Sequence, residues 1–134
     1  MFLHVFNDDQ KAFFVTAARL LCALDSVEAR GEKRYMDAAF REMDVSNTGG
    51  ESGSLKALLT SSVVFGTDLS KRVLLLELCG LAASDGIISA SETQFLAGVA
   101  DAVGLDRHVV TTFGEYSIRR RTLLEEGRQL VLNA

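Results

Sequence analysis

Apolar residues recur along most of this chain at intervals of three and four positions, which is the spacing of one face of an α-helix. The pattern predicts seven helices, over about residues 8–25, 32–44, 55–65, 69–83, 89–103, 106–115 and 117–132. No segment sustains the alternation of apolar and polar residues that is typical of a strand, and the chain contains no proline. We therefore expect an all-α protein, a single compact bundle of about seven helices over residues 1–134.

The segment 69–83 differs from the other predicted helices because it is apolar around much of its circumference. A helix of this kind is buried on several sides, whereas a surface helix keeps one polar face. We expect it to be the central helix of the bundle. Its apolar residues are Val73, Leu74, Leu75, Leu76, Leu78, Leu81 and Ala82.

Several predicted helices carry end signals. Asn7 with Gln10, and Ser89 with Glu92, have the spacing of a capping box, in which each side chain bonds the other residue's backbone N–H. Thr67 or Asp68 is placed to cap the helix that follows Gly66, and Asp106 the helix that follows Gly104. Gly86 and Gly104 each follow a predicted helix, where the left-handed conformation of glycine ends it.

An internal similarity suggests two helix-loop-helix units. Aligning Cys22 with Cys79 places Leu21 on Leu78 and Glu28 on Asp85. Three extra residues in the later loop then place Glu32 on Glu92. We interpret the units as pseudo-repeats packed around the central helix, although any two amphipathic hairpins share such a pattern.

Composition limits the class of partner. The 134-residue chain has a net charge of −4 and a pI near 5.1, which does not favour nucleic acid or an anionic membrane. No apolar run reaches the roughly 18 residues of a membrane-spanning helix, and no signal peptide is recognisable. We expect a cytoplasmic protein without membrane insertion. Residues 46–54 read as a mobile loop, and Cys22 and Cys79 as reduced core thiols.

Five carboxylates are candidate metal ligands. Glu77 lies among leucines, where an unpaired charge is costly to bury, so it must reach solvent, find a partner or shift its pKa. Asp85 follows two helical turns later on the same face. With Glu92, and with Glu28 and Glu32 from the first unit, these oxygens could hold a hard divalent cation.

Two structural alternatives compete with the metal site. Glu77 could point outward and pair with a Lys or Arg, and Ser89 with Glu92 could serve only as a cap. The segment from Asp85 to Glu92 also matches the second half of an EF-hand calcium loop. The first half does not match, because Leu81 and Ala83 stand where oxygen ligands belong.

The run LLLELCGLAASDGIISASETQFLAGVADAVGLD, residues 74–106, resembles the TerB-like domains, which are named for a tellurite-resistance protein and also occur attached to J-domain co-chaperones. The resemblance lies in the Asp85-Gly86 joint, in the Ile-Ser-x-x-Glu sequence that begins at Ile88, and in the closing Val103-Gly104-Leu105. The chain departs from the family pattern at Ala83-Ser84-Asp85-Gly86, where the family has Ala-Asp-Gly. The resemblance implies an all-α bundle without known enzymatic activity. It also implies a role in bacterial stress responses, through a divalent metal or a protein partner.

The remaining charged groups narrow the function to two classes. The basic run Arg119-Arg120-Arg121 could meet an acidic partner, but Glu125 and Glu126 follow on the same helix and can pair with it. No His or Cys has a recognisable catalytic partner in the sequence. We therefore expect a non-enzymatic module with a protein partner. The alternative is a metal-dependent enzyme or metal sensor that uses Glu77, Asp85 and Glu92.

Overall fold

The computed structural model describes residues 2–24, 30–44 and 55–133, and within these ranges the chain is helical without any strand. The all-α prediction is confirmed. The helices are α1 (Asp8–Ala23), α2 (Arg30–Met43), α3 (Leu55–Thr60), α4 (Asp68–Ala82), α5 (Ala90–Val103) and α6 (His108–Leu132), with short 3-10 turns η1 (Leu3–Val5), η2 (Ser62–Val64) and η3 (Ala83–Asp85). The predicted loop at 46–54 lies outside the described residues.

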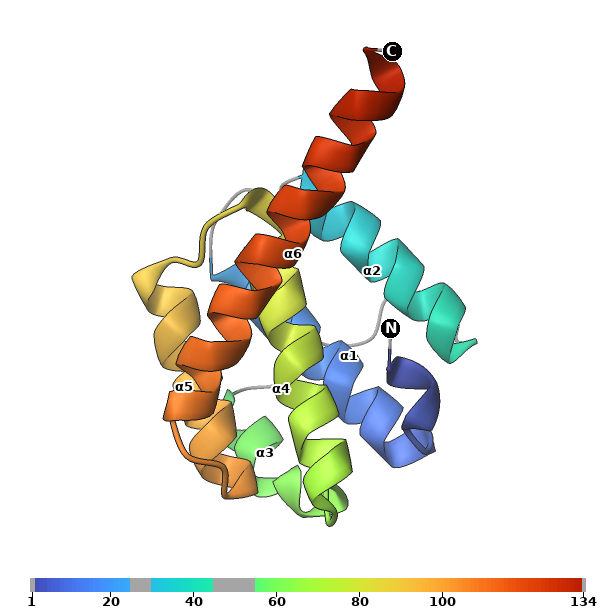
Figure 1. Ribbon diagram of the computed structural model, residues 1–134. Coiled ribbons are helices and arrows are strands. Elements are labelled where there is room, and N and C mark those ends of the chain that lie inside the picture. The colour runs from blue at the N-terminus through green and yellow to red at the C-terminus, as the bar shows by residue number, and fades with distance from the viewer. Residues whose placement is uncertain (1, 25–29, 45–54, 134) are drawn as a thin grey trace.

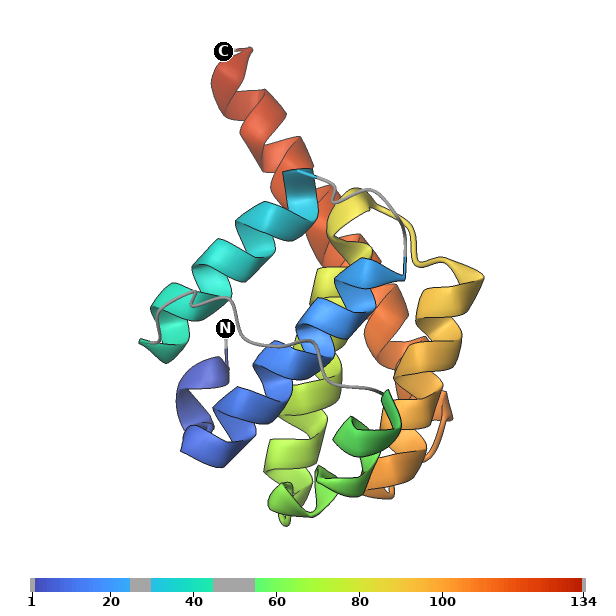
Figure 2. The ribbon, with the colours of Figure 1, turned by 180° about the vertical axis from the view of Figure 1, so that it is seen from behind.

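Helix α4 lies at the centre of the bundle, as its apolar circumference predicts. It packs against α1, α2, α5 and α6. Figure 1 shows α6 crossing in front of it, and Figure 2 shows α1 across its opposite side. Leu74, Leu75 and Leu78 have no solvent exposure. The described helices thus share one hydrophobic core built around α4.

The predicted helix starts are present as hydrogen-bonded caps. The Asn7 side chain accepts from the backbone N–H of Gln10 at 2.9 Å, and the Gln10 side chain accepts in return from Asn7. Ser89 and Glu92 form the same reciprocal pair at the start of α5. Thr67, and not Asp68, caps α4. These local signals place the ends of the helices that build the core.

The predicted helix stops are also present. Gly86, after η3, has φ of 96°, and Gly104, after α5, has φ of 82°. Both values lie in the left-handed region, which favours glycine because it has no Cβ. Asp106 is not the N-cap of α6 as predicted: the N-cap is Arg107, which makes no side-chain cap bond, although the side chain of Asp106 accepts a hydrogen bond from the backbone N–H of His108 at 2.8 Å.

One helix, α6, replaces the two predicted at 106–115 and 117–132, so the described part of the chain has six α-helices instead of seven. The sequence between these segments contains no proline and no positive-φ glycine that would end a helix. Ser117, interpreted as a new start, is buried inside the continuous helix. Gly114 allows the close approach of Ile88, whose Cδ1 atom would lie 3.2 Å from an added Cβ. The continuity matters because it sends the end of α6 beyond the bundle (Figure 1).

Two further predictions concern the core thiols and the membrane. Cys79 is buried and Cys22 is half-buried, and neither forms a disulfide, which agrees with their interpretation as core residues. None of the described helices combines the length and the apolar character that crossing a membrane requires.

Candidate functional site

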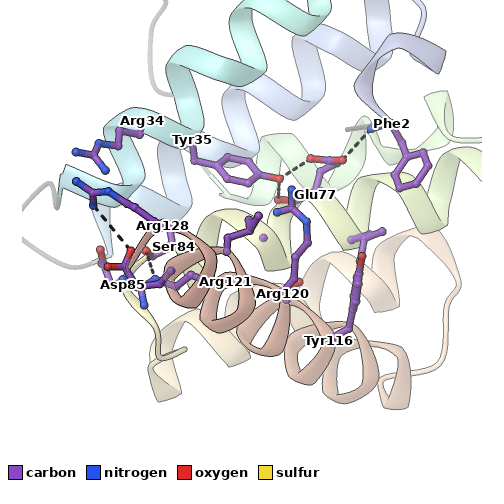
Figure 3. Close-up of a pocket in the computed structure, with 15 residues that line it drawn as sticks. Phe2, Arg34, Tyr35, Glu77, Ser84, Asp85, Tyr116, Arg120, Arg121 and Arg128 are labelled. Carbon is purple, nitrogen blue, oxygen red and sulfur yellow. Dashed lines mark hydrogen bonds and ion pairs between the residues drawn. The ribbon is translucent and has the colours of Figure 1, made fainter. Parts of the chain in front are cut away.

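A cleft of about 740 Å³ lies where α2, α4, η3 and α6 meet. Figure 3 shows side chains from all four elements facing it, together with Phe2 from the start of the chain. Its volume falls in the range of roughly 300–1,000 Å³ that is usual for small-molecule sites. The described residues that line it include no His and no Cys.

Glu77 lines the cleft and has found partners, one of the outcomes that its leucine-rich surroundings predict. Its side chain is 4% exposed. The carboxylate accepts a hydrogen bond from the backbone N–H of Phe2 at 3.0 Å and another from the Tyr35 hydroxyl. In Figure 3 the guanidinium of Arg120 points toward the same pair. The prediction that Glu77 points outward is wrong, because these contacts hold the carboxylate inside.

Tyr35 reaches Glu77 because α4 has a glycine where the tyrosine ring lies. A Cβ added at Gly80 would lie 2.8 Å from the Tyr35 hydroxyl oxygen and 3.1 Å from its Cε2 atom. The same hydroxyl lies 2.9 Å from the backbone carbonyl oxygen of Glu77. Burial, followed by the negative charge of Glu77, raises the pKa of Tyr35 well above its usual value of 10.0, although the charge of Arg120 opposes the shift.

We predict that stability falls in alkali through Tyr35 and Cys79. Burial raises the pKa of the Cys79 thiol from 9.0 to about 12. An acid whose pKa is higher in the folded state stabilises the protein fully below its unfolded pKa, and this stability is lost as the pH rises toward the folded pKa. The loss should therefore begin near pH 9 for Cys79 and near pH 10 for Tyr35.

The measurement is urea unfolding at a series of pH values above 8. Cys79→Ala should reduce the decrease in the free energy of unfolding that begins near pH 9. Tyr35→Phe should reduce the decrease that begins near pH 10. An alkaline slope that neither variant changes would contradict the assignment.

Asp85 is exposed on η3 and lines the same cleft as Glu77. The joint that carries it is held by α6. Arg121 donates from Nε to the backbone carbonyl of Ser84 at 2.8 Å. An added Cβ at Gly86 would meet Nη1 of Arg121 at 3.2 Å. The Asp85-Gly86 joint therefore depends on a close contact with α6 as well as on the left-handed glycine.

The other predicted metal ligands lie elsewhere or outside the described residues. Glu92 is buried at the start of α5, where it accepts from the Ser89 backbone N–H at 2.9 Å. Glu32 is buried in α2, and neither glutamate lines the cleft. Glu28 lies outside the described residues. Among the described side chains, no three His, Cys, Asp or Glu residues are grouped so that they could hold a metal ion. The divalent-cation site that includes Glu28 stays a prediction.

The arginines of the cleft are the feature that sequence reasoning missed. Arg34 comes from α2, and Arg120, Arg121 and Arg128 come from α6. The basic run is not simply paired with the following glutamates, since Arg121 bonds a backbone carbonyl of η3. The seven-residue interval from Arg121 to Arg128 places both on one side of α6, and this was a usable signal. Nothing in the sequence indicated that Arg34 would join them.

Comparison with known proteins identifies no relative, since no family model, no curated protein and no solved structure matches this chain.

Proposed function

We propose that this chain is a non-enzymatic interaction module that binds an acidic amphipathic helix of a partner protein along the projecting end of α6. The observation that carries the proposal is the position of that end. After its contacts with the bundle, α6 continues into solvent (Figures 1 and 2). Leu132 is 63% exposed in its last turn, and four further exposed apolar side chains precede it: Leu123 (65% exposed), Leu124 (59%), Leu130 (75%) and Val131 (77%).

These four residues form one surface, which we call the α6 stripe. Their spacing of one, seven and eight positions places them on the same side of the helix. A monomer gains nothing from presenting large apolar side chains together in water, and such clusters commonly mark protein contacts. An apolar helical stripe is most directly covered by the apolar face of another helix.

Charge favours an acidic partner. Residues 119–132 contain four arginines and two glutamates, a net charge of +2, whereas the whole chain carries −4. Arg121 and Arg128 stand on one side of the stripe and repeat at the interval of two helical turns. Glutamates at matching intervals beside a partner's apolar face would meet them and favour the encounter.

A role in bacterial stress is a finer part of the proposal and follows the resemblance to TerB-like domains. Two pseudo-repeated units, α1 with α2 and α4 with α5, are a second finer part and follow the internal similarity of the sequence. Burial supports the repeat at two aligned pairs. Leu21 and Leu78 are 1% and 0% exposed. Glu32 and Glu92 are 3% and 4% exposed, each in the first turn of its helix.

A designed peptide tests the interaction. The probe is a synthetic amphipathic helix with leucines on one face and glutamates beside them, titrated by calorimetry and compared with a peptide in which lysines replace the glutamates. The acidic peptide should bind, and Leu130→Asp should weaken it by at least about thirtyfold, because the variant places a charge in an apolar contact. Val63→Asp is the control, since Val63 is 80% exposed on η2, away from α6.

Three outcomes would overturn the proposal. If the lysine peptide binds equally well, the proposal of an acidic partner is wrong. If neither peptide binds, the α6 stripe is not a docking surface for a helix. Self-association of the chain that Leu130→Asp abolishes, measured by sedimentation, would assign the stripe to a second copy.

A further inference from the structure

The cleft concentrates positive charge in an acidic protein. Four of the chain's 14 lysines and arginines line it: Arg34, Arg120, Arg121 and Arg128. The carboxylates along it are Glu77, Asp85 and Glu125. Glu77 lies at the floor, where Phe2 and Tyr35 bond it and Arg120 points toward it. The other three arginines belong to the end of the cleft beside η3.

Glu125 lies among those three arginines. It accepts a hydrogen bond from Gln129 at 3.0 Å, and its carboxylate lies 3.9 Å from Nη1 of Arg128. The Gln129 bond, followed by the charges of Arg128, Arg121 and Arg34, lowers the pKa of Glu125. One carboxylate cannot balance three guanidinium groups. With Asp85 included, this end of the cleft still carries one excess positive charge.

The opposite end of the cleft is aromatic. Phe2 and Tyr116 both lie on that side of it, away from Arg34 and Arg128 (Figure 3). Their side chains are 46% and 38% exposed, so both rings present area to a ligand. Arginine binds phosphate and carboxylate through paired N–H groups, and aromatic rings cover apolar or planar groups.

We propose that the cleft binds a small amphiphilic organic anion. Its phosphate or carboxylate head lies at Arg34, Arg121 and Arg128, and its aromatic or aliphatic body lies against Phe2 and Tyr116. Glu125 is an internal competitor, because its carboxylate pairs with Arg128, one of the guanidinium groups that the head would use. This site shares Leu124, Arg121 and Arg128 with the face of α6 proposed above for the helical partner, whereas Arg34, Phe2 and Tyr116 belong to the cleft alone and Leu130 does not line it.

Titration calorimetry with three probes tests the site: phenyl phosphate, benzoate and inorganic phosphate. Phenyl phosphate should bind tightest, because it has both the doubly charged head and the ring. Arg34→Gln and Arg128→Gln should each weaken it by about tenfold, the usual effect of losing a charged hydrogen bond. Glu125→Gln should strengthen it severalfold. Arg119→Gln is the matched control, since Arg119 is exposed on α6 and does not line the cleft.

The variants separate the two halves of the ligand. Phe2→Ala should weaken phenyl phosphate and leave inorganic phosphate unchanged, since the backbone N–H that bonds Glu77 is retained. If benzoate binds more tightly than phenyl phosphate, the charged head of the ligand is a carboxylate that binds at the same site. The proposal is overturned if no probe saturates at millimolar concentration, if Arg119→Gln matches Arg34→Gln, or if Glu125→Gln weakens binding. Leu130→Asp should leave these titrations unchanged, so this site and the helical partner can fail independently.

Discussion

Replacing Glu77 by Ala is expected to lower the free energy of unfolding by about 2 kcal/mol, because the Phe2 N–H loses its acceptor and the Tyr35 hydroxyl keeps only the backbone carbonyl of residue 77. Removing the side chain also leaves an unfilled space beneath Tyr35. The negative charge of the Glu77 carboxylate, toward which Arg120 points, is lost as well. Chemical denaturation of the two proteins measures the difference. Glu77→Gln should cost less, since its amide oxygen can still accept one of the bonds.

The double variant with Tyr35→Phe identifies the origin of the loss. If the Tyr35 hydrogen bond carries much of the effect, the two substitutions together should cost less than the sum of the single ones. Additive losses would show that Glu77 and Tyr35 stabilise the bundle separately. A Glu77→Ala protein as stable as the parent would contradict the assignment of Glu77 as a bonded floor residue.

Truncating Phe14 to Ala should have the largest effect on stability, about 4 kcal/mol, because it combines the lost burial of a ring with a cavity that the neighbours fill only in part. Phe14 has no solvent exposure and lies in α1, the helix that covers α4. Its ring centroid is 6.2 Å from that of Phe6, which in turn makes an edge contact with Phe65 at 5.5 Å. Removal of the Phe14 ring should therefore weaken the packing of α1 and also that of the first turns of the chain, where Phe6 lies.

Thermal unfolding and urea titration measure the loss in Phe14→Ala. Val63→Ala is the matched apolar truncation at an exposed position and should change stability by less than about 0.5 kcal/mol. Because Phe14 does not line the cleft, anion binding should survive in Phe14→Ala at temperatures where the variant remains folded. If Phe14→Ala unfolds at the same temperature and urea concentration as the parent protein, the Phe14 ring does not pack as described.

Local sequence determined the helices and most of their ends. A capping box needs only side chains three residues apart, so Asn7 with Gln10 and Ser89 with Glu92 could be predicted without knowledge of the packing. Gly86 and Gly104 could be predicted for the same reason. The break expected near residue 116 was wrong, because serine favours an N-cap but does not by itself end a helix, and Ser117 is buried within the continuous α6.

The candidate site depended on contacts that no local pattern contains. Glu77 was recognisable as a charge among leucines, but its partners Phe2 and Tyr35 lie 75 and 42 residues away in the chain. The same applies to Arg34, which meets the α6 arginines only after α2 and α6 pack beside α4.

The all-α character, the central apolar helix and the capped helix ends follow from local patterns, since hydrophobic spacing and side-chain-to-backbone bonds act over a few residues. Three-dimensional packing was needed to show which carboxylates share a cleft, which arginines surround Glu125, and that the end of α6 extends beyond the bundle. These features arise from the packing of distant helices, because the direction in which each face points is fixed only when the shared core forms.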